Sequence, residues 1–293
     1  LYGDEGIREL YGREGFDFFK GDITNIRDIV NAMSNIDTVV HLAAIVGDPA
    51  SKVKPKETLE INYFSTKALC DVARYLGISK FIFASTCSVY GFKNEICNEE
   101  TDPNPLSLYA ETKLMAEKAL LASINGNFCP VVLRFATVYG WSPRMRFDLV
   151  ANLLIAKAIV DKEITVFGKG LQHRPFIHVK DVARAIIKVL EAPPKLVCGE
   201  IFNVGSDEQN MSIRELAEKI KQKIPDSEIK FIEKKEDDRS YIVSFKKIRE
   251  RLGFVPIYSI DVAIDEIKEA FRKGLVSDYR DKKYSNYKSL KDY

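Results

Sequence analysis

Short apolar stretches alternate with longer amphipathic ones along most of the chain. The stretch 81–84 is apolar at each position and lacks helix-capping residues, which is typical of a strand buried on both faces. Similar stretches predict strands at 37–44, 129–135 and 200–204, and alternating aromatic and polar residues predict another at 16–23. Apolar residues that recur every three to four positions predict helices at 55–76, 109–123, 148–161, 182–191, 212–223 and 260–273. This alternation predicts an α/β fold with a doubly wound parallel sheet.

The pattern changes after residue 140. A loop and the helix at 148–161 lead to a short apolar stretch at 164–168, and the segment 174–181 is expected to return to the sheet. A second departure follows residue 205. We therefore expect a large domain made of 1–140 and about 176–205, and a smaller α/β domain made of about 141–175 and 206–280. The charged, tyrosine-rich tail 281–293 has no apolar period, so we expect it to be loosely ordered.

Composition narrows the class of protein. The chain of 293 residues is 46% hydrophobic, and its 44 Lys and Arg nearly balance its 42 Asp and Glu. Net charge therefore indicates neither a nucleic-acid partner nor a membrane partner. The five cysteines are scattered without a C-x-x-C pair, which argues against a disulfide framework and a zinc site and favours a reducing cytoplasm. The most apolar helical stretch is too short to span a bilayer.

The residues most typical of catalysis lie between 80 and 113. Ser85, Thr86 and Ser88 follow the strand at 81–84, and the helix at 109–123 begins with Tyr109 and Lys113, four residues apart on one helix face. A phenol with a pKa of about 10 is a poor base at neutral pH, but a nearby cation and a hydroxyl hydrogen bond favour the phenolate. Tyr109 could then take a proton from a substrate alcohol, although such a pair also occurs by chance on helix surfaces.

Further motifs extend this pattern. They are Gly21-Asp22, His41-Leu-Ala-Ala44, Asn62, Ser85-Thr-Cys-Ser-Val-Tyr-Gly91, Tyr109-x-x-x-Lys113, Leu133-Arg-Phe-Ala-Thr-Val-Tyr-Gly140, Arg174-Pro-Phe-Ile-His-Val179 and Phe202-Asn-Val-Gly205. With them the chain resembles an extended short-chain dehydrogenase/reductase of the NAD-dependent nucleotide-sugar epimerase/dehydratase family, most of all its UDP-glucose 4-epimerase-like branch. The motifs follow the family's order from the start of the chain to about residue 255.

The resemblance implies a Rossmann-like NAD-binding domain followed by a substrate domain. Such a fold normally opens with a strand, a glycine-rich turn and a helix whose N-terminus holds the cofactor pyrophosphate. The early glycines, Gly3, Gly6, Gly12 and Gly15, follow no apolar strand and fit no such turn. By resemblance, the first strand, glycine-rich loop and first helix are missing, and we expect an N-terminally truncated fragment that binds NAD weakly and turns over poorly.

The resemblance also implies a reaction and the residues that carry it. A hydride passes from a sugar carbon, usually C4, to NAD, with Tyr109 as the base. Lys113 lowers the pKa of Tyr109 and holds the nicotinamide ribose, while Thr86 hydrogen-bonds the reacting oxygen. The resulting 4-keto sugar can then be reduced from its other face.

Binding residues are implied in the same way. The cofactor, NAD, is expected to contact Asp22, Ile23, Leu42, Ala43, Ala44, Asn62, Ser85, Tyr109, Lys113, Phe135 and Val138. The substrate, a nucleotide-diphosphate sugar, is expected to contact Thr86, Ser88, Thr137, Asn152, Phe167, Arg174 and Arg239. Arginine forks suit phosphate oxygens, although each arginine alone could equally form a surface salt bridge. We expect a homodimer and no metal site.

Residues next to Thr86 discriminate between reactions of the family. Its 4,6-dehydratases carry an Asp-Glu pair directly after this threonine, whereas this chain has Cys87-Ser88 and lacks an acid and a base for eliminating water. Branches that epimerise C3 and C5 place a cysteine where this chain has Ser88, and the period of a strand turns Cys87 away. Plain 4-epimerisation needs none of these groups, so we predict an NAD-dependent 4-epimerase.

Other activities stay open. A keto-sugar nucleotide reductase would keep Thr86, Tyr109 and Lys113 but exchange NADPH, and the residues that choose between NAD and NADP are absent from this sequence. A dehydratase is a further alternative, and an NAD-binding regulatory or assembly protein would need no turnover. Thr137 and Ser244 depart from the asparagine and aspartate common in the family, which leaves the nucleotide and the sugar open.

Overall fold

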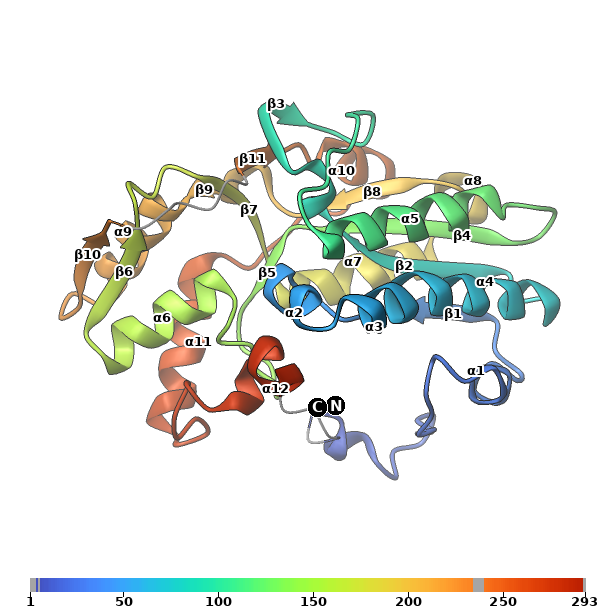
Figure 1. Cartoon of the computed structure of the whole chain (residues 1–293), viewed down its shortest axis with the longest axis horizontal. Coiled ribbons are helices and arrows are strands. Elements are labelled where there is room, and N and C mark those ends of the chain that lie inside the picture. Colours follow the sequence, from blue (N-terminus) through green and yellow to red (C-terminus); the bar gives the residue numbers. More distant parts are fainter. Residues whose placement is uncertain (1–3, 5, 234–239, 292–293) are drawn as a thin grey trace.

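The computed structural model describes residues 4, 6–233 and 240–291 (Figure 1). Its main sheet has four parallel strands in the order β1-β2-β4-β8, with bounds Thr38–His41, Lys80–Thr86, Cys129–Phe135 and Ile201–Val204. Phe135 pairs with Thr86 on one side and with Val204 on the other, so these strands end together at one edge. The predicted parallel α/β sheet is confirmed.

Helices cover both faces of this sheet, because successive strand residues point to opposite sides. Phe81 and Phe83 of β2 pack in a core shared with α4 and α5, whereas Ile82 points into a core shared with α7. The bounds of the covering helices are Ser65–Tyr75 for α4, Leu108–Ala122 for α5 and Val179–Glu191 for α7. The apolar stretch 81–84 therefore contributes side chains to the cores on both faces of the sheet, as its sequence predicts.

Shorter elements connect these layers. Before α5 they are η1 (Arg8–Leu10), α1 (Ile26–Ala32), α2 (Asp48–Val53), α3 (Pro55–Leu59), the π-helical turn η2 (Glu60–Phe64), η3 (Cys87–Tyr90) and β3 (Phe92–Cys97). Between β4 and α9 they are β5 (Thr137–Tyr139), α6 (Val150–Val160), β6 (Glu163–Phe167), β7 (His173–His178), α8 (Pro194–Val197), η4 (Asp207–Gln209) and β9 (Asn210–Ser212). From there on they are α9 (Ile213–Lys223), β10 (Glu228–Ile232), β11 (Ser240–Val243), α10 (Lys246–Leu252), α11 (Ile260–Arg272), η5 (Lys282–Tyr284) and α12 (Asn286–Lys291).

A second core lies beside the main sheet and is formed by residues between 139 and 284, among them apolar side chains of α6, α9 and α11. Strands of the small sheets β5-β7-β9 and β6-β10 contribute side chains to it, whereas the sheet β3-β11 packs against the core of the main sheet. The sequence predicts that 174–181 returns to the main sheet, but β7 pairs with β5 and β9 instead. The place beside β4 is taken by β8, as the bond from Ala136 N–H to the Val204 carbonyl shows (2.9 Å). The domain boundaries given above remain a prediction.

The predicted strand at 16–23 is wrong. These residues join no ladder in the described part of the chain, and Phe18 and Phe19 are about half exposed. A strand needs a hydrogen-bonded neighbour, and among the described residues none pairs with the outer edge of β1. Asp22 instead closes a turn before α1, where its carboxylate accepts the backbone N–H and the hydroxyl of Thr24 (2.8 Å each).

The expectation of a loosely ordered tail is wrong for the residues up to 291. Both η5 and α12 are formed, and Tyr284 and Leu290 are buried. The Tyr284 ring packs edge-on against Phe147, whose backbone N–H donates to the Tyr284 carbonyl (3.0 Å). Two buried apolar side chains are enough to dock the tail, although they create no regular period in the sequence.

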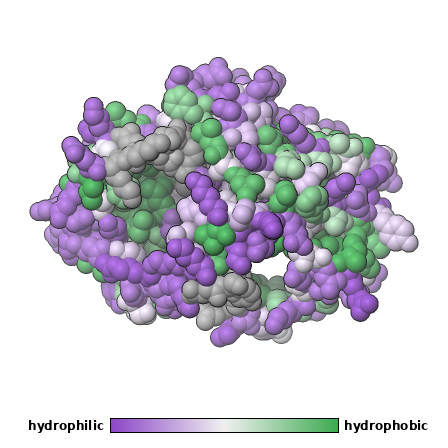
Figure 2. All heavy atoms as spheres, in the orientation of Figure 1, coloured by the Kyte–Doolittle hydropathy of each residue, from purple (hydrophilic) through white to green (hydrophobic). Residues whose placement is uncertain are grey.

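Figure 2 shows hydrophilic side chains over most of one face, with apolar side chains among them. Large apolar side chains exposed near α4 and α5 include Phe64, Tyr75 and Met115. Within the described ranges, no helix has the length and apolar character needed to cross a bilayer.

Candidate active site

The end of β2 carries the predicted catalytic hydroxyl. Thr86 Oγ1 accepts the backbone N–H of Ser88 (3.1 Å) and so starts the tight turn η3. The turn ends at Gly91 in a left-handed conformation (φ +68°), where a Cβ would overlap the Asn104 carbonyl oxygen. A glycine here lets the loop of Asn104 pack directly against the turn that follows Thr86.

Helix α5 brings Tyr109 to the same point. Ser107 caps the helix, since its hydroxyl accepts the N–H of Ala110 (3.2 Å) and donates to Asp48 Oδ1 (2.6 Å). Tyr109, in the first turn, is buried, and it lies close enough to Thr86 for the Thr86 hydroxyl to lower the pKa of its phenol. The structure thus brings together the two residues that the sequence pairs.

The pKa of Tyr109 reflects opposing effects. Burial raises this pKa to about 12, whereas the Thr86 hydroxyl and the positive charge of Arg146 lower it. The sequence predicts that Lys113 supplies the cation. In the structure, Arg146 is the charged group that lowers the pKa of Tyr109 most, and sequence reasoning missed it because the loop 140–147 is distant along the chain.

Lys113 lies one turn further along the same buried face of α5. Its ammonium is 4.0 Å from the centroid of the Phe83 ring, within range of a cation–π contact. Burial lowers the pKa of Lys113 to about 7, and the Glu117 carboxylate opposes this shift. In the structure as it stands, Lys113 is therefore a cation that loses its proton easily.

A buried polar network fixes β2 against α5. The Ser85 hydroxyl donates to Glu117, and Arg134 of β4 forms a bidentate pair with the same carboxylate (2.7 and 3.1 Å). Arg134 Nη1 also donates to the Tyr90 hydroxyl (3.0 Å), which donates to Asn203 Oδ1 of β8 (2.9 Å). All five side chains are at most 3% exposed. Ser85, predicted to contact NAD, has its hydroxyl engaged in this network.

Asn62, also predicted to contact NAD, lies buried in the π-helical turn η2. Its side-chain oxygen accepts the N–H of Ile45 (2.8 Å). Its Nδ2 donates to the Ile45 carbonyl (3.0 Å) and to the Thr112 hydroxyl (3.2 Å). The amide therefore holds the loop after β1 against α5, and its polar atoms contact the chain itself. Single π turns inside helices are frequent at functional sites.

Asn152 of α6 holds the loop 140–147. Its Oδ1 accepts the N–H of Gly140 (3.0 Å), and its Nδ2 donates to the Arg146 carbonyl (3.0 Å). Arg146 then forms a bidentate pair with Asp148 (3.0 Å for each bond). The sequence predicts that Asn152 binds the substrate, but the residue is 3% exposed and its amide is used to shape the loop that carries Arg146.

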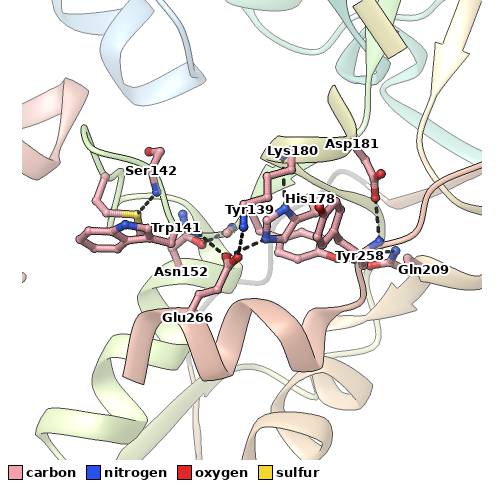
Figure 3. Close-up of polar contacts among 12 residues, drawn as sticks. Tyr139, Trp141, Ser142, Asn152, His178, Lys180, Asp181, Gln209, Tyr258 and Glu266 are labelled. Carbon is pink, nitrogen blue, oxygen red and sulfur yellow. Dashed lines mark hydrogen bonds and ion pairs between the residues drawn. The ribbon is translucent and has the colours of Figure 1, made fainter. Parts of the chain in front are cut away.

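Figure 3 shows the contacts that anchor the start of this loop. His178 Nε2 is 3.0 Å from Glu266 Oε2 of α11, while Nδ1 accepts the Lys180 N–H (3.2 Å), so the neutral ring carries its proton on Nε2. Burial lowers the pKa of His178, which favours this neutral form. Glu266 also accepts the Trp141 N–H (3.3 Å). Gly140 (φ +105°) packs on the His178 ring, which any Cβ at this position would overlap.

Tyr241 of β11 is a site residue that sequence reasoning missed. Its hydroxyl lies 3.5 Å from Ser88 Oγ, and its charge when ionised would raise the pKa of Tyr109. The Arg174 guanidinium lies 5.6 Å from the centroid of the Tyr241 ring. Tyr241 therefore lies between Ser88, in the turn after Thr86, and Arg174, which the sequence predicts to bind the phosphates of the substrate. No local signal marks it, because β11 reaches this place only by pairing with β3.

The remaining predicted residues are spread along the carboxyl edge and beyond it. Directly after β1, Leu42 and Ala43 are exposed and Ala44 is half-buried, and Ile23 is half-buried near α1. Phe135, Thr137 and Val138 are half-buried at the end of β4 and in β5, and Phe167 is 44% exposed at the end of β6. Arg239 lies outside the described residues. No group of three or more His, Cys, Asp or Glu side chains in the described ranges could hold a metal ion.

Comparison with known proteins identifies relatives. Residues 4–205 match the NAD dependent epimerase/dehydratase family. The chain is 34% identical to the uncharacterized UDP-glucose epimerase YtcB of Bacillus subtilis over 209 residues, which cover 70% of this chain and 64% of that protein. It is 33% identical to the UDP-glucuronate 4-epimerase of Thermodesulfobacterium geofontis over 72% of this chain and 65% of that protein.

Solved structures give the same picture. The UDP-glucuronic acid 4-epimerase of Bacillus cereus, in complex with UDP-glucuronic acid and NAD, superposes with a TM-score of 0.81 at 29% identity, covering 91% of this chain and 85% of that one. The UDP-glucose 4-epimerase of Thermotoga maritima, with UDP-glucose, superposes with a TM-score of 0.79 at 26% identity, covering 88% and 85%. The chain spans about 64–65% of the length of the two curated relatives above. It belongs to the NAD dependent epimerase/dehydratase family.

Proposed function

We propose that this protein is an NAD-dependent 4-epimerase of a nucleotide-diphosphate sugar and acts through a 4-keto intermediate. The observation that carries the proposal is the meeting of Thr86 and Tyr109 at the carboxyl edge of the sheet, with Lys113 one helical turn away. The relatives support the substrate class, because the solved structures named above contain UDP-glucuronic acid or UDP-glucose, and one also contains NAD.

The proposed mechanism assigns the proton to Tyr109. As a phenolate, Tyr109 takes the proton of the sugar C4 hydroxyl, while the Thr86 hydroxyl donates a hydrogen bond to the reacting oxygen. NAD, when bound, would accept the hydride from C4 and return it. Tyr109 then gives its proton back to the 4-keto oxygen, and hydride return to the opposite face of the sugar produces the epimer. Thr86 and Arg146 both lower the pKa of Tyr109, so both favour the phenolate.

The residues at the carboxyl edge suit a dinucleotide. Leu42 is 57% exposed and Ala43 is exposed, and the small side chains of Ala43 and Ala44 would allow a ligand to approach the backbone closely. We assign NAD to these residues and to Tyr109 and Lys113. The larger domain, 1–140 with about 176–205, would hold NAD. The smaller one, about 141–175 with 206–280, would hold the nucleotide-diphosphate sugar.

For the substrate, Arg174 and Arg239 are assigned to the phosphates, because a planar guanidinium matches phosphate oxygens. Phe167 is assigned to the nucleotide base, and Thr137 and Ser88 to the sugar. Arg174 is 7% exposed and its Nη1 donates to the His173 carbonyl (2.8 Å), which supports a fixed orientation of its guanidinium.

Cys87 supports epimerisation over dehydration. The residue is fully buried, its thiol donates to the Arg134 carbonyl (3.2 Å), and burial raises its pKa well above the ordinary value for a thiol. It therefore offers no proton to a sugar bound at Thr86. Ser88 carries a hydroxyl that stays neutral near pH 7 and so cannot serve as the base that removes a carbon-bound proton.

Product analysis tests the reaction. The protein is incubated with NAD and, in turn, with UDP-, CDP-, GDP- and dTDP-linked hexoses and hexuronates. We expect at least one C4 epimer pair to interconvert with no change in mass. A product that has lost water, such as a stable 4-keto-6-deoxy sugar nucleotide, would contradict epimerisation, and consumption of NADPH with a keto-sugar nucleotide would support the reductase instead.

We also propose a homodimer in the cytoplasm. Phe64, Tyr75 and Met115 leave apolar surface exposed near α4 and α5, where a second copy could cover it. The five free cysteines suit a reducing compartment. Sedimentation equilibrium of the protein, with and without NAD, would measure the mass of the assembly, and a monomer at micromolar concentration would contradict the dimer.

A further inference from the structure

Two cysteines face each other at the amino edge of the main sheet. Cys129 is the first residue of β4, and Cys198 directly follows α8, with Gly199 and Glu200 between it and β8. The Gly199 N–H donates to the Pro130 carbonyl (2.8 Å) at the start of the β4–β8 pairing. The backbones of the two segments therefore run side by side at the spacing of neighbouring strands, about 5 Å.

The two cysteines lie opposite each other. Continuing the β4–β8 register back from the pair of Val132 and Ile201 sets Cys129 against Cys198, and Cys198 Sγ lies 3.9 Å from the carbonyl oxygen of Phe128. Cys198 is exposed, whereas Cys129 is buried. The pair thus combines one thiol that a solute can reach with a second thiol directly behind it.

The other cysteines have different surroundings. Cys70 is bound to the Ser123 hydroxyl (3.1 Å), and Cys87 is bound to the Arg134 carbonyl (3.2 Å). Cys97 is buried at the end of β3. All three of these side chains are buried, unlike that of Cys198.

We propose that Cys129 and Cys198 form a thiol–disulfide exchange site, whose oxidant is a low-molecular-weight disulfide such as glutathione disulfide. The Cys198 thiolate attacks one sulfur of the oxidant, which forms a mixed disulfide and releases the first thiol. Cys129 then attacks the Cys198 sulfur, which forms the Cys129–Cys198 disulfide and releases the second thiol. Two electrons and two protons pass from the two cysteines to the oxidant, so the step balances.

The surroundings fix the order of the two attacks and the lability of the product. Burial, followed by contact with Cys198, raises the pKa of Cys129 to about 12, while the cation of Lys80 opposes this shift. The exposed Cys198 therefore reacts first. Disulfides that solvent can reach are reduced more easily than buried ones, and Cys198 is exposed, which makes the site reversible.

The site is remote from the proposed active site. In the ladder of β2 and β4, Cys129 pairs with Lys80 and Phe135 pairs with Thr86, so the two sites lie at opposite ends, about 20 Å apart. Oxidation therefore leaves the contact between Thr86 and Tyr109 unchanged. The bond would instead close 129–198 into a loop and restrict the unfolded chain.

Peptide mapping tests the site without an activity assay. The purified, reduced protein is incubated with glutathione disulfide, and its peptides are analysed by mass spectrometry without reduction. We expect a cross-linked peptide pair containing Cys129 and Cys198, a loss of two titratable thiols, and recovery of both with dithiothreitol. The thermal midpoint of the oxidised protein should be raised by roughly 3–8 °C. A stable glutathione adduct on Cys198 beside a free Cys129 would overturn the proposal.

Variants separate the two steps. In Cys129→Ser the second attack is impossible, so the glutathione adduct should accumulate on Cys198, whereas Cys198→Ser should take up no glutathione at Cys129. Cys70→Ser is the matched control and should still cross-link. In Cys198→Ser, a cross-link between Cys129 and another cysteine would overturn the assignment. In the unsubstituted protein, a Cys129–Cys198 cross-link without a rise in thermal midpoint would overturn the stabilising effect. The mapping of the unsubstituted protein decides the question even if a variant fails to fold.

Discussion

Thr86 lies close enough to Tyr109 for its hydroxyl to lower the pKa of the phenol, although one residue ends a strand and the other begins a helix. Two local devices produce this meeting. Thr86 is fixed by its bond from the Ser88 N–H, and the start of α5 is fixed by the Ser107 cap, which is itself bound to Asp48. The proposed proton acceptor therefore has a defined position before any ligand binds.

Tyr109→Phe should remove most of the turnover. The change deletes the proton acceptor but keeps the ring, so kcat should fall about 10²–10⁴-fold while the Kd of the nucleotide sugar stays the same. Steady-state kinetics and calorimetric titration measure the two quantities. Tyr75→Phe, on the exposed face of α4, is the control and should behave as the unsubstituted protein. Retention of more than about a tenth of the rate by Tyr109→Phe would remove this residue from the mechanism.

Lys113 should make the free energy of unfolding depend on pH. Its pKa is about 7 in the folded protein and about 10.4 in the unfolded chain, so between these values the unfolded state binds more protons and stability rises with pH. From pH 7 to pH 9 the contribution is about 2 kcal/mol. Urea unfolding of the protein and of Lys113→Met at both pH values should show this difference in slope. Parallel pH profiles for the two proteins would show that Lys113 keeps its ordinary pKa.

Glu117→Gln should destabilise the protein strongly. The change leaves the buried Arg134 guanidinium without its carboxylate, and breaking a buried pair in this way costs about 3–5 kcal/mol. Denaturant unfolding measures the loss. Glu111→Gln, on the exposed side of the same helix, is the matched control and should change stability little. If both substitutions changed the free energy of unfolding equally, the buried network would contribute no more to stability than an exposed side chain of α5.

Asn152→Ala should loosen the loop 140–147. Two hydrogen bonds to the loop backbone are lost, each worth about 1 kcal/mol, so the free energy of unfolding should fall by about 2 kcal/mol. Since Arg146 is then held less firmly and lowers the pKa of Tyr109 less, we also expect a lower kcat. The exposed Asn127→Ala serves as the control. An unchanged kcat with the expected loss of stability would separate this loop from catalysis.

The main sheet and the meeting of Thr86 with Tyr109 could be predicted because the signals are local. An apolar strand, a run of hydroxyl residues and a helix start define both partners. The same holds for the strand of 129–135, which is confirmed with these bounds as β4. In each case the decisive residues lie within a few positions of one another.

Contacts between distant segments could not be predicted in this way. Arg146 and Tyr241 reach the site from the loop after β5 and from β11, and no short-range pattern marks them. Asn62 and Asn152 were assigned to ligands by resemblance, yet their amides contact backbone atoms of other segments. Aromatic and polar residues alternate along 16–23 as they do in a strand. This pattern does not reveal whether a neighbouring strand is available for pairing.

The π-helical turn Glu60–Phe64 makes this part of the protein sensitive to insertions and deletions rather than to substitutions. Removing one residue from the turn would restore regular α-helical winding and change the direction in which the side chains of the turn point. Asn62 would then leave the Ile45 backbone, and the loop after β1 would lose its attachment to α5. Homologous chains that keep this loop should therefore preserve the length of 55–75 more strictly than its composition.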